Sequence, residues 1–467
     1  MNEVYLEKPA NPDTIDLRPL ADDKALLKNP HKGWYIHYID NGIVRPAYRD
    51  TIRDGDYLKD LPLINHLYLR VDWSDIEPEE GKFDWSYLDR IFDEWGSRGY
   101  KFSFRFCTYE TPNPHATPEW VRLAGAKGTF VDPPETSPEL RHWEPDYGDR
   151  IYLDKLEHFI AACAKKYDGH PLVEFVDVGT FGTWGEGHTF AGTGKRYSAD
   201  VLRLHADLHA KYFANTTLLI NDDFCHTAYL GGESSFGRDG VESALRLTDY
   251  LAARGMGARD DSICVAGYAK TYGYDTLRNG PFFDKFYKTA PVDIELEHFA
   301  AIADDVILDC FPFMEALKRS HATYAGFHGD PRVWYDRYRP FTEYMGNRLG
   351  YWYFLNRIDL PKCVSGLKTL AYLEVENRGL APAYNPYTLK LRVRSNGSCH
   401  EIFTADGLNL GWDGKKEELL RLNFADVAPG KYQLELGLFE SELPIKLALK
   451  SELCDGGWYR LCELDVE

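Results

Sequence analysis

The amino-acid sequence predicts an α/β protein, a (β/α)8 TIM barrel followed by a smaller all-β sandwich domain. Between about residue 30 and residue 350, eight short apolar runs alternate with amphipathic segments, which is the pattern of eight strand–helix repeats. From residue 368 onward, runs with a period of two are separated by turn residues, which is typical of a sandwich. We therefore expect a barrel at residues 1–355 and a sandwich at residues 356–467.

The barrel strands are predicted from runs rich in β-branched and aromatic residues. In chain order they are Trp34–Asp40, His66–Trp73, Lys101–Cys107, Val173–Gly179, Thr217–Asp223, Ser262–Tyr268, Pro291–Glu297 and Thr323–His328. The stretches Asp84–Gly96 and Ile151–Tyr167 place their apolar residues on one helical face, and each leads into a strand. No GxGxxG motif follows the first run, which disfavours a doubly wound nucleotide-binding sheet.

Composition narrows the classes of partner. A net charge of −19 argues against nucleic acid and against an anionic membrane, because both present negative phosphates. No apolar run reaches transmembrane length, and the first residues lack the apolar core of a signal peptide. The nine cysteines are scattered singly, as in reduced cytosolic proteins. We expect a cytoplasmic protein that needs no cofactor, and self-association into a homo-oligomer stays open.

The loop after the fourth predicted strand holds the first candidate catalytic residue. Residues 179–188 read GTFGTWGEGH, and the glutamate is Glu186. Active sites of barrels lie at the carboxyl ends of the strands, so Glu186 is expected above the barrel mouth. The glycines allow a tight turn that would hold the carboxylate in one place. The alternative interpretation is a solvated glutamate in an ordinary turn.

The seventh predicted strand has three carboxylates on one face. Side chains alternate along a strand, so Asp293, Glu295 and Glu297 point the same way, and the apolar Ile294 and Leu296 point to the other side. The apolar pair is expected to face the helices, which turns the carboxylates inward. Buried carboxylates are costly unless they are paired or functional, so this strand predicts a site. A structural ion pair with Arg70 or Arg105 would also accommodate one of them.

Together, the fourth and seventh strands predict glycosidase chemistry. Glycoside hydrolysis needs two carboxylates on opposite sides of the scissile bond, one to protonate the leaving oxygen and one to attack or to activate water. Strands four and seven lie across a barrel from each other. We therefore expect Glu186 to act as acid/base and either Glu295 or Glu297 as the second carboxylate.

Other strand ends carry candidate substrate-binding groups. A platform of Trp34, His37 and Trp73 near the rim would suit the apolar faces of a sugar, and core packing is the competing interpretation for these residues. Tyr268 is expected to orient the second carboxylate, and Arg70 to hold its charge. The remaining candidates are Asp72, Arg105, Asp177, Trp184, His188, Asn221, Asp222 and His328.

Several motifs resemble a poorly characterised group of bacterial barrel proteins related to clan A glycoside hydrolases. The motifs are the residues 29–35, NPHKGWY, the segment 73–85, WSDIEPEEGKFDW, and the loop 179–189. The second of these is similar to the segment after strand two in family-42 β-galactosidases. Residues 377–382 resemble the start of the group's C-terminal sandwich. The resemblance implies an acid/base glutamate after strand four and a nucleophilic glutamate at the end of strand seven.

One departure from the clan A pattern leaves the stereochemistry open. Those enzymes carry Asn-Glu at the end of strand four, whereas this chain has Gly179-Thr180 there and the carboxylate follows at Glu186. That position is closer to the strand-four acid of β-amylases, which invert. We favour retention, and exo action on short oligosaccharides.

Two other functions are compatible with the sequence. The first is a non-catalytic carbohydrate-binding or scaffold protein on a barrel fold. The second is a divalent-metal enzyme with Glu295, Glu297, His298 and Asp222 as ligands, although alternation along the strand would not place all of them on one side. Neither the identity of the sugar nor the role of the sandwich follows from the sequence.

Overall fold

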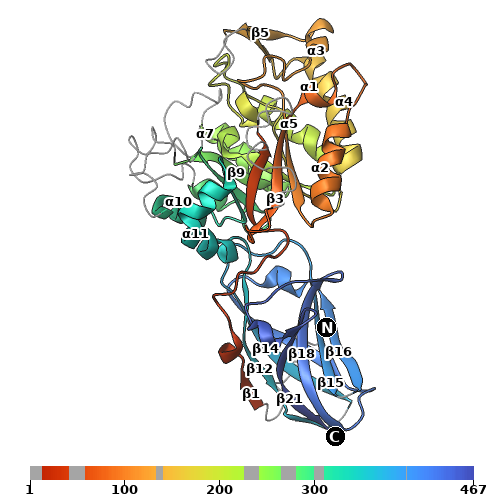
Figure 1. The fold of residues 1–467 in the computed structure, drawn as a ribbon. Coiled ribbons are helices and arrows are strands. Elements are labelled where there is room, and N and C mark those ends of the chain that lie inside the picture. The colour runs from red at the N-terminus through yellow and green to blue at the C-terminus, as the bar shows by residue number, and fades with distance from the viewer. Residues whose placement is uncertain are drawn as a thin grey trace. The chain divides into compact units, whose positions relative to one another are not determined.

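The computed structural model describes residues 13–40, 58–132, 140–225, 241–264, 280–298, 310–365, 367–395 and 397–467. These residues form two compact units, one of residues 34–343 and one that combines the segments up to 33 and from 344 onward. Figure 1 shows the strands and helices of both units. No helix among the described residues is long and apolar enough to cross a membrane.

The first unit is a closed barrel of eight parallel strands, and the predicted fold class is confirmed. Its strands follow one another around the barrel in chain order, with β11 closing against β2. The strands are β2 (Gly33–Ile39), β3 (Ile64–Asp72), β4 (Lys101–Cys107), β7 (Val173–Asp177), β8 (Thr217–Asn221), β9 (Gly257–Ile263), β10 (Val292–Leu296) and β11 (Tyr324–Phe327).

Helices stand around these strands (Figure 1). They are α1 (Trp73–Ile76), α2 (Ser86–Gly96), α3 (Glu119–Leu123), α4 (Arg150–Tyr167), α5 (Ala199–Tyr212), α7 (Val241–Ala253), α9 (Gly280–Phe283), α10 (Phe311–Arg319) and α11 (Pro331–Arg348). In α2, the buried residues Leu88, Ile91, Phe92 and Trp95 form one face, as the periodicity predicts. A two-stranded hairpin, β5 (Gly128–Val131) with β6 (His142–Pro145), lies in the long segment after β4.

The sixth barrel strand is displaced from its predicted position. It spans Gly257–Ile263, whereas Ser262–Tyr268 was expected. The cause is the charged run from Arg259 to Asp261, which reads as a turn in the sequence but is buried in the barrel. Tyr268, expected to orient a catalytic carboxylate, lies outside the described residues.

The barrel interior has an aromatic layer below a charged layer. The aromatic layer consists of Tyr35, Tyr68, Phe175 and Tyr324, packed with Leu219. Farther along the same strands toward their carboxyl ends, the inward-pointing residues are arginines, histidines and carboxylates. Barrel interiors normally hold branched apolar residues, so this charged layer marks the end that faces the site.

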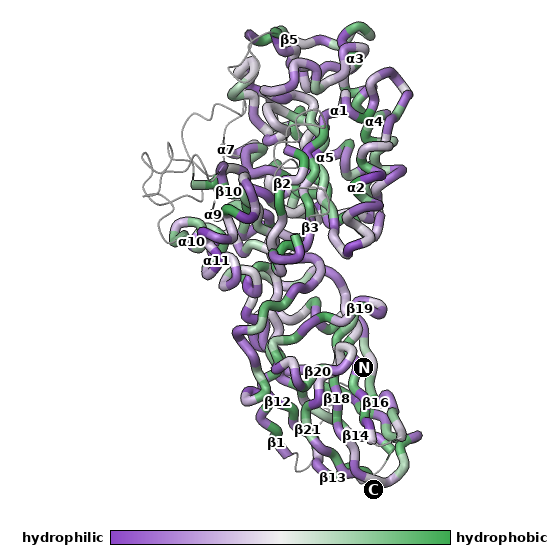
Figure 2. The backbone as a smooth tube through the Cα atoms, viewed as in Figure 1, coloured by the Kyte–Doolittle hydropathy of each residue, from purple (hydrophilic) through white to green (hydrophobic). Residues whose placement is uncertain are grey.

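The second unit is a sandwich of two sheets. One has the order β1 (Asp13–Asp16), β12 (Tyr353–Leu360), β14 (Lys368–Asn377) and β17 (Lys415–Asn423). The other has the order β13 (Cys363–Val364), β21 (Trp458–Val466), β18 (Gly430–Glu440), β15 (Thr388–Ser395) and β16 (Ser398–Asp406), with β19 (Leu443–Pro444) beside β18 and β20 (Cys454–Asp455) beside β21. Hydrophobic and hydrophilic residues alternate along strands such as β14 (Figure 2). The apolar faces of both sheets form one core.

The division into units differs from the boundary expected at residue 355, because the N-terminal segment is part of the sandwich. Its strand β1 pairs antiparallel with β12, from Asp13 opposite Leu360 to Asp16 opposite Arg357. Lys32, from the sequence motif at residues 29–35, is buried here and donates to the carbonyl oxygens of Asn347 and Tyr351 at 2.7 and 2.6 Å. Burial lowers the pKa of Lys32 to about 7.

Candidate active site

Glu186 follows a short 3-10 turn, Thr183–Gly185, in a loop that folds tightly on itself. The backbone N–H of Thr183 donates to the carbonyl of His188 at 2.6 Å, and the N–H of Glu186 donates to the carbonyl of Thr183 at 3.0 Å. Trp184 has a left-handed backbone with φ of 55°. A non-glycine residue rarely adopts this conformation unless its surroundings enforce it, so the loop is held in one strained shape.

Gly182 gives the sharpest test of this loop. Its φ of 85° and ψ of −177° lie in a region restricted to glycine, and a Cβ there would meet the carbonyl oxygen of His188 at 2.1 Å. We expect Gly182→Ala to destabilise the protein by about 1–3 kcal/mol and to lower any activity that depends on Glu186. Gly194→Ala is the matched control, because it also has a positive φ, of 64°, but open space around its Cβ. Equal losses of stability in urea denaturation of the two variants would contradict this account.

The carboxylate of Glu186 is buried and contacts two nitrogen groups. Its Oε1 lies 3.7 Å from the guanidinium of Arg105, and its Oε2 lies 3.2 Å from Nε2 of His188. The side chain of Glu186 is 10% exposed. Arg105 comes from β4, and it also donates to the carbonyl of Trp184 at 3.2 Å. Glu186 is therefore oriented by a neighbouring strand as well as by its own loop.

Glu295 is fully engaged inside the barrel. Its carboxylate is bound by Arg259 and His328, and Nε2 of His37 lies 3.3 Å from its Oε2. Only 2% of its side chain is exposed. Arg259, His328 and His37 together surround both carboxylate oxygens of Glu295. Such contacts are typical of a buried carboxylate with a structural role.

Asp293 lies two residues before Glu295 on β10, deeper in the barrel, and it also binds Arg259. Arg259 binds Asp293, Glu295 and Asp261 at once, and Asp293 also accepts from the hydroxyl of Tyr35 at 3.0 Å. Burial raises the pKa of Asp293 to about 7, although Arg259 lowers it. The arginine that accommodates the inward carboxylates is thus Arg259, whereas the sequence suggested Arg70 or Arg105.

Glu297, the residue just after β10, is a carboxylate that stays partly exposed. It follows the last residue of the strand, and its backbone N–H donates to the carbonyl of Ile263 at 3.1 Å. Burial raises the pKa of Glu297, and the negative charge of Glu186 raises it further. Both glutamates follow the carboxyl ends of their strands, β7 and β10.

A third group of charges surrounds Arg70 on β3. Its Nε lies 3.2 Å from Oε1 of Glu110, and another of its nitrogens lies 3.5 Å from Asp40. Burial raises the pKa of Glu110 to about 7, with a further contribution from the charge of Glu186. Sequence reasoning missed Glu110, although its place three residues after β4 could have indicated it. Asp72, also on β3, is fully buried and accepts from Asn113 at 2.5 Å.

The other predicted binding residues fall into two sets. Trp184 is partly exposed and its Nε1 donates to Thr111 at 2.9 Å, so it lies at the mouth with Glu186. Asp177 and Asn221 lie below it, bound respectively to Arg105 at 3.2 Å and to Asp261 at 2.7 Å. Asp222 is buried in the turn after β8. The structure therefore groups Trp184, His188 and Arg105 with Glu186, and assigns Asp177 and Asn221 to the ion network.

The predicted aromatic platform at the rim is wrong for Trp34. Its ring is fully buried outside the barrel, within 6.4 Å of the rings of Phe313, Phe327, Trp334 and Phe341. Side chains alternate along a strand, and the next residue, Tyr35, points into the barrel. The side chain of Trp34 therefore points outward, toward the helices. His37 points inward but binds Glu295 and Asp40.

The residues around Glu295 have the composition of a transition-metal site but not its geometry. Ligand atoms of His37, Glu295 and His328 lie within 4.8 Å of one another. An imidazole binds a metal in the plane of its ring, yet His37 and His328 are stacked face to face at 3.8 Å with 21° between their planes. Their lone pairs therefore do not converge on one ion, and Arg259 already neutralises Glu295.

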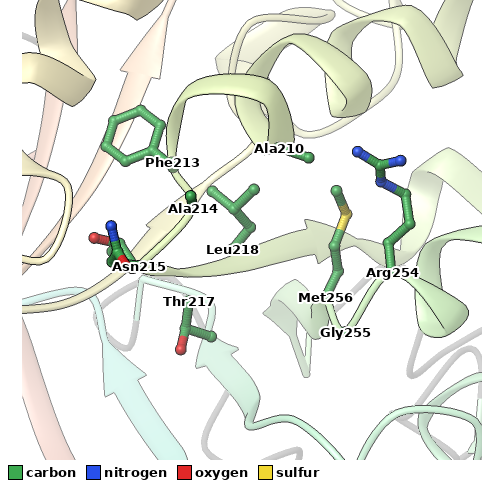
Figure 3. Close-up of a pocket in the computed structure, with 10 residues that line it drawn as sticks. Ala210, Phe213, Ala214, Asn215, Thr217, Leu218, Arg254, Gly255 and Met256 are labelled. Carbon is green, nitrogen blue, oxygen red and sulfur yellow. The ribbon is translucent and has the colours of Figure 1, made fainter.

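A cavity of about 610 Å³ lies at the other end of the barrel (Figure 3). Ala210, Phe213, Leu218, Arg254 and Met256 are among the residues that line it, and they come from the end of α5 and the starts of β8 and β9. Strands of a barrel are parallel, so the cavity is remote from the carboxyl ends that carry Glu186 and Glu297. It is not part of the candidate site.

Comparison with known proteins gives a partial match to glycosidases. Residues 64–180 match the model of glycoside hydrolase family 42, described as β-galactosidase. This part of the chain is related to the glycoside hydrolases. The matched stretch runs from β3 to the residues just after β7 and ends before Glu186.

The curated relative and the similar structures are more distant. β-Galactosidase BbgII from Bifidobacterium bifidum is 31% identical over 103 residues, which is 22% of this chain and only 14% of BbgII. Endo-glycoceramidase II from Rhodococcus sp. is 12% identical over 86% of this chain and 99% of its own, with a TM-score of 0.42. An endo-β-1,4-mannanase from Thermotoga petrophila is 11% identical over 95% of this chain and 98% of its own, also with a TM-score of 0.42.

Proposed function

We propose that the protein is a retaining glycoside hydrolase that removes terminal sugars from short oligosaccharides. The observation that carries the proposal is that Glu186 and Glu297 both follow the carboxyl ends of barrel strands, β7 and β10. Burial raises the pKa of Glu297, and the negative charge of Glu186 also contributes to this rise. The relationship of residues 64–180 to family-42 β-galactosidases supports the reaction class.

In this mechanism Glu186 is the acid/base and Glu297 the nucleophile. Protonated Glu186 gives its proton to the leaving oxygen as the carboxylate of Glu297 attacks the anomeric carbon, so the glycosidic bond breaks and a glycosyl ester forms. Glu186 then takes a proton from water, which attacks the same carbon and releases Glu297. Arg105 lies 3.7 Å from Glu186 and can stabilise the charge that appears there after the first step.

Contacts inside the barrel favour Glu297 over Glu295 as the nucleophile. A nucleophilic carboxylate needs a lone pair that points to the sugar, whereas both oxygens of Glu295 are bound by Arg259, His328 and His37. Glu297 is partly exposed and lies two residues farther along the chain, nearer the mouth of the barrel. In this assignment, Glu295 is the anion that holds the histidines in place.

Covalent trapping tests both the reaction and the assignment. Aryl β-galactosides are the first substrates to assay, followed by a panel of other aryl glycosides and disaccharides. A 2-deoxy-2-fluoro analogue of the accepted sugar should inactivate the protein and add one glycosyl group, which peptide mass spectrometry should locate on Glu297. A label on Glu295 would contradict the assignment.

Two further outcomes would redirect the proposal. Hydrolysis without trapping, with inversion of the anomeric centre by NMR, would make Glu297 a general base that activates water. Binding of a sugar without hydrolysis of any member of the panel would favour a carbohydrate-binding protein on a barrel fold.

A further inference from the structure

Next to Glu186 is a histidine whose proton position follows from its contacts. The backbone N–H of Phe190 donates to Nδ1 of His188 at 3.1 Å, so Nδ1 is an acceptor and carries no proton. Nε2 of the same ring lies 3.2 Å from Oε2 of Glu186. In the neutral ring, the hydrogen must therefore be on Nε2 and is donated to the carboxylate.

The surroundings hold this pair in place. The ring of His188 is buried, and it meets the ring of Trp184 edge to face at 5.8 Å. Charged groups face the pair from several elements: Arg105 lies 3.7 Å from Glu186, and Asp223 lies 3.9 Å from Nε2 of His188. Asp223 thus approaches the same ring nitrogen that faces Glu186. Burial raises the pKa of Glu110 and of Glu297, and the negative charge of Glu186 contributes to both rises. Burial also raises the pKa of Glu144, which His188 lowers in part.

We propose that His188 is a positioning residue that sets the proton affinity of Glu186. This inference rests on the proposed function, in which Glu186 gives up a proton and later recovers it. When Glu186 has passed its proton to the leaving oxygen, the Nε2–H of His188 donates to the carboxylate that results. His188 keeps its own proton throughout, and water supplies the proton that returns to Glu186.

Two substitutions separate this role from a structural one. His188→Asn keeps an acceptor near the position of Nδ1 for Phe190 but is too short to reach Glu186. His188→Gln extends an amide N–H toward the position of Nε2 and gives up the acceptor near Nδ1. The first variant therefore loses the contact with Glu186, and the second loses the contact with the backbone.

The readout is the titration of the Glu186 side chain, which does not depend on turnover. Protein labelled with [5-¹³C]glutamate is titrated by NMR, and the Glu186 signal is assigned by its loss in Glu186→Gln. We expect the midpoint to rise by about 1–2 pH units in His188→Asn, the size expected when a hydrogen bond to a charged group is lost. His188→Gln should stay close to the wild-type midpoint.

Other results would overturn the role. An unchanged midpoint in His188→Asn means that the histidine serves only the loop. Equal shifts in both variants would come from disturbed loop structure, which also contradicts the proposal. If the wild-type protein hydrolyses no glycoside, the proposed function fails, whereas the titration still decides whether His188 controls Glu186.

Discussion

Glu186→Gln should lower kcat/KM for a substrate with a poor leaving group by about 10²–10⁴-fold, because general acid catalysis is lost. The glutamine keeps the size of the side chain, and its single amide oxygen can accept from one of the two donors that face Glu186, Arg105 or His188. An aryl glycoside with a very good leaving group needs little protonation, so its glycosylation step should suffer much less. Steady-state kinetics on two aryl glycosides of different acidity measure the difference.

The leaving-group dependence distinguishes acid catalysis from a general loss of folding. Glu157→Gln on α4 is the control, since Glu157 is a partly exposed residue paired with Lys211. That variant should match the wild type on both substrates. Added azide should restore activity to Glu186→Gln, because azide attacks the glycosyl ester in place of water and needs no general base. Equal losses on both substrates would remove Glu186 from the acid/base role.

Arg259→Met should destabilise the barrel by about 3–5 kcal/mol, because it leaves buried carboxylates without their counter-charge. Arg259 is the shared partner of Asp261, Asp293 and Glu295, and its side chain is 1% exposed. The matched control is Arg246→Met on α7, where an exposed arginine pairs with Glu242 at 2.7 Å. Exposed pairs contribute about 0–1 kcal/mol, so urea denaturation should separate the two variants clearly.

The decrease in the free energy of unfolding caused by Arg259→Met should be larger at pH 8 than at pH 5. In the folded protein the pKa of Asp293 is about 7, above its ordinary value near 3.8, so ionisation of Asp293 opposes folding and stability falls as pH rises between these values. Removing Arg259 raises this pKa further and extends the fall to higher pH. Adding Asp293→Asn and Glu295→Gln should restore most of the stability. A loss that does not change with pH would mean that packing dominates.

Most of the fold could be predicted because its pattern is local. Alternation along β10 and the apolar face of α2 depend on neighbouring residues, and both match the structure. The position of β9 could not be predicted, since Arg259 is accommodated in the barrel by Asp293 and Glu295 of β10 as well as by Asp261 of its own strand. The strand β1 was missed for a similar reason, as its partner β12 is remote in sequence.

The candidate site was predictable at the level of strand ends but not of side-chain roles. Periodicity placed Glu295 and Glu297 on one face, yet it could not say that Arg259 and two histidines bind Glu295. Trp34 was wrongly assigned to a sugar platform, because an aromatic side chain near a strand end can pack equally well against a sugar or against the surrounding helices. Glu110 could have been noted from its place just after β4, but its contact with Arg70 could not be predicted from the sequence.

The pairing of β1 with β12 makes the barrel an insertion within a sandwich domain. During synthesis, β1 emerges first and cannot complete its sheet until the whole barrel has been made, which gives the sandwich a high contact order. The barrel, by contrast, contains all eight of its strands between residues 33 and 327. A fragment that starts near residue 344 would lack an edge strand and expose an unpaired β12. Expression of the isolated sandwich therefore calls for a fusion in which the segment before residue 34 is joined to the segment after residue 343 by a short linker.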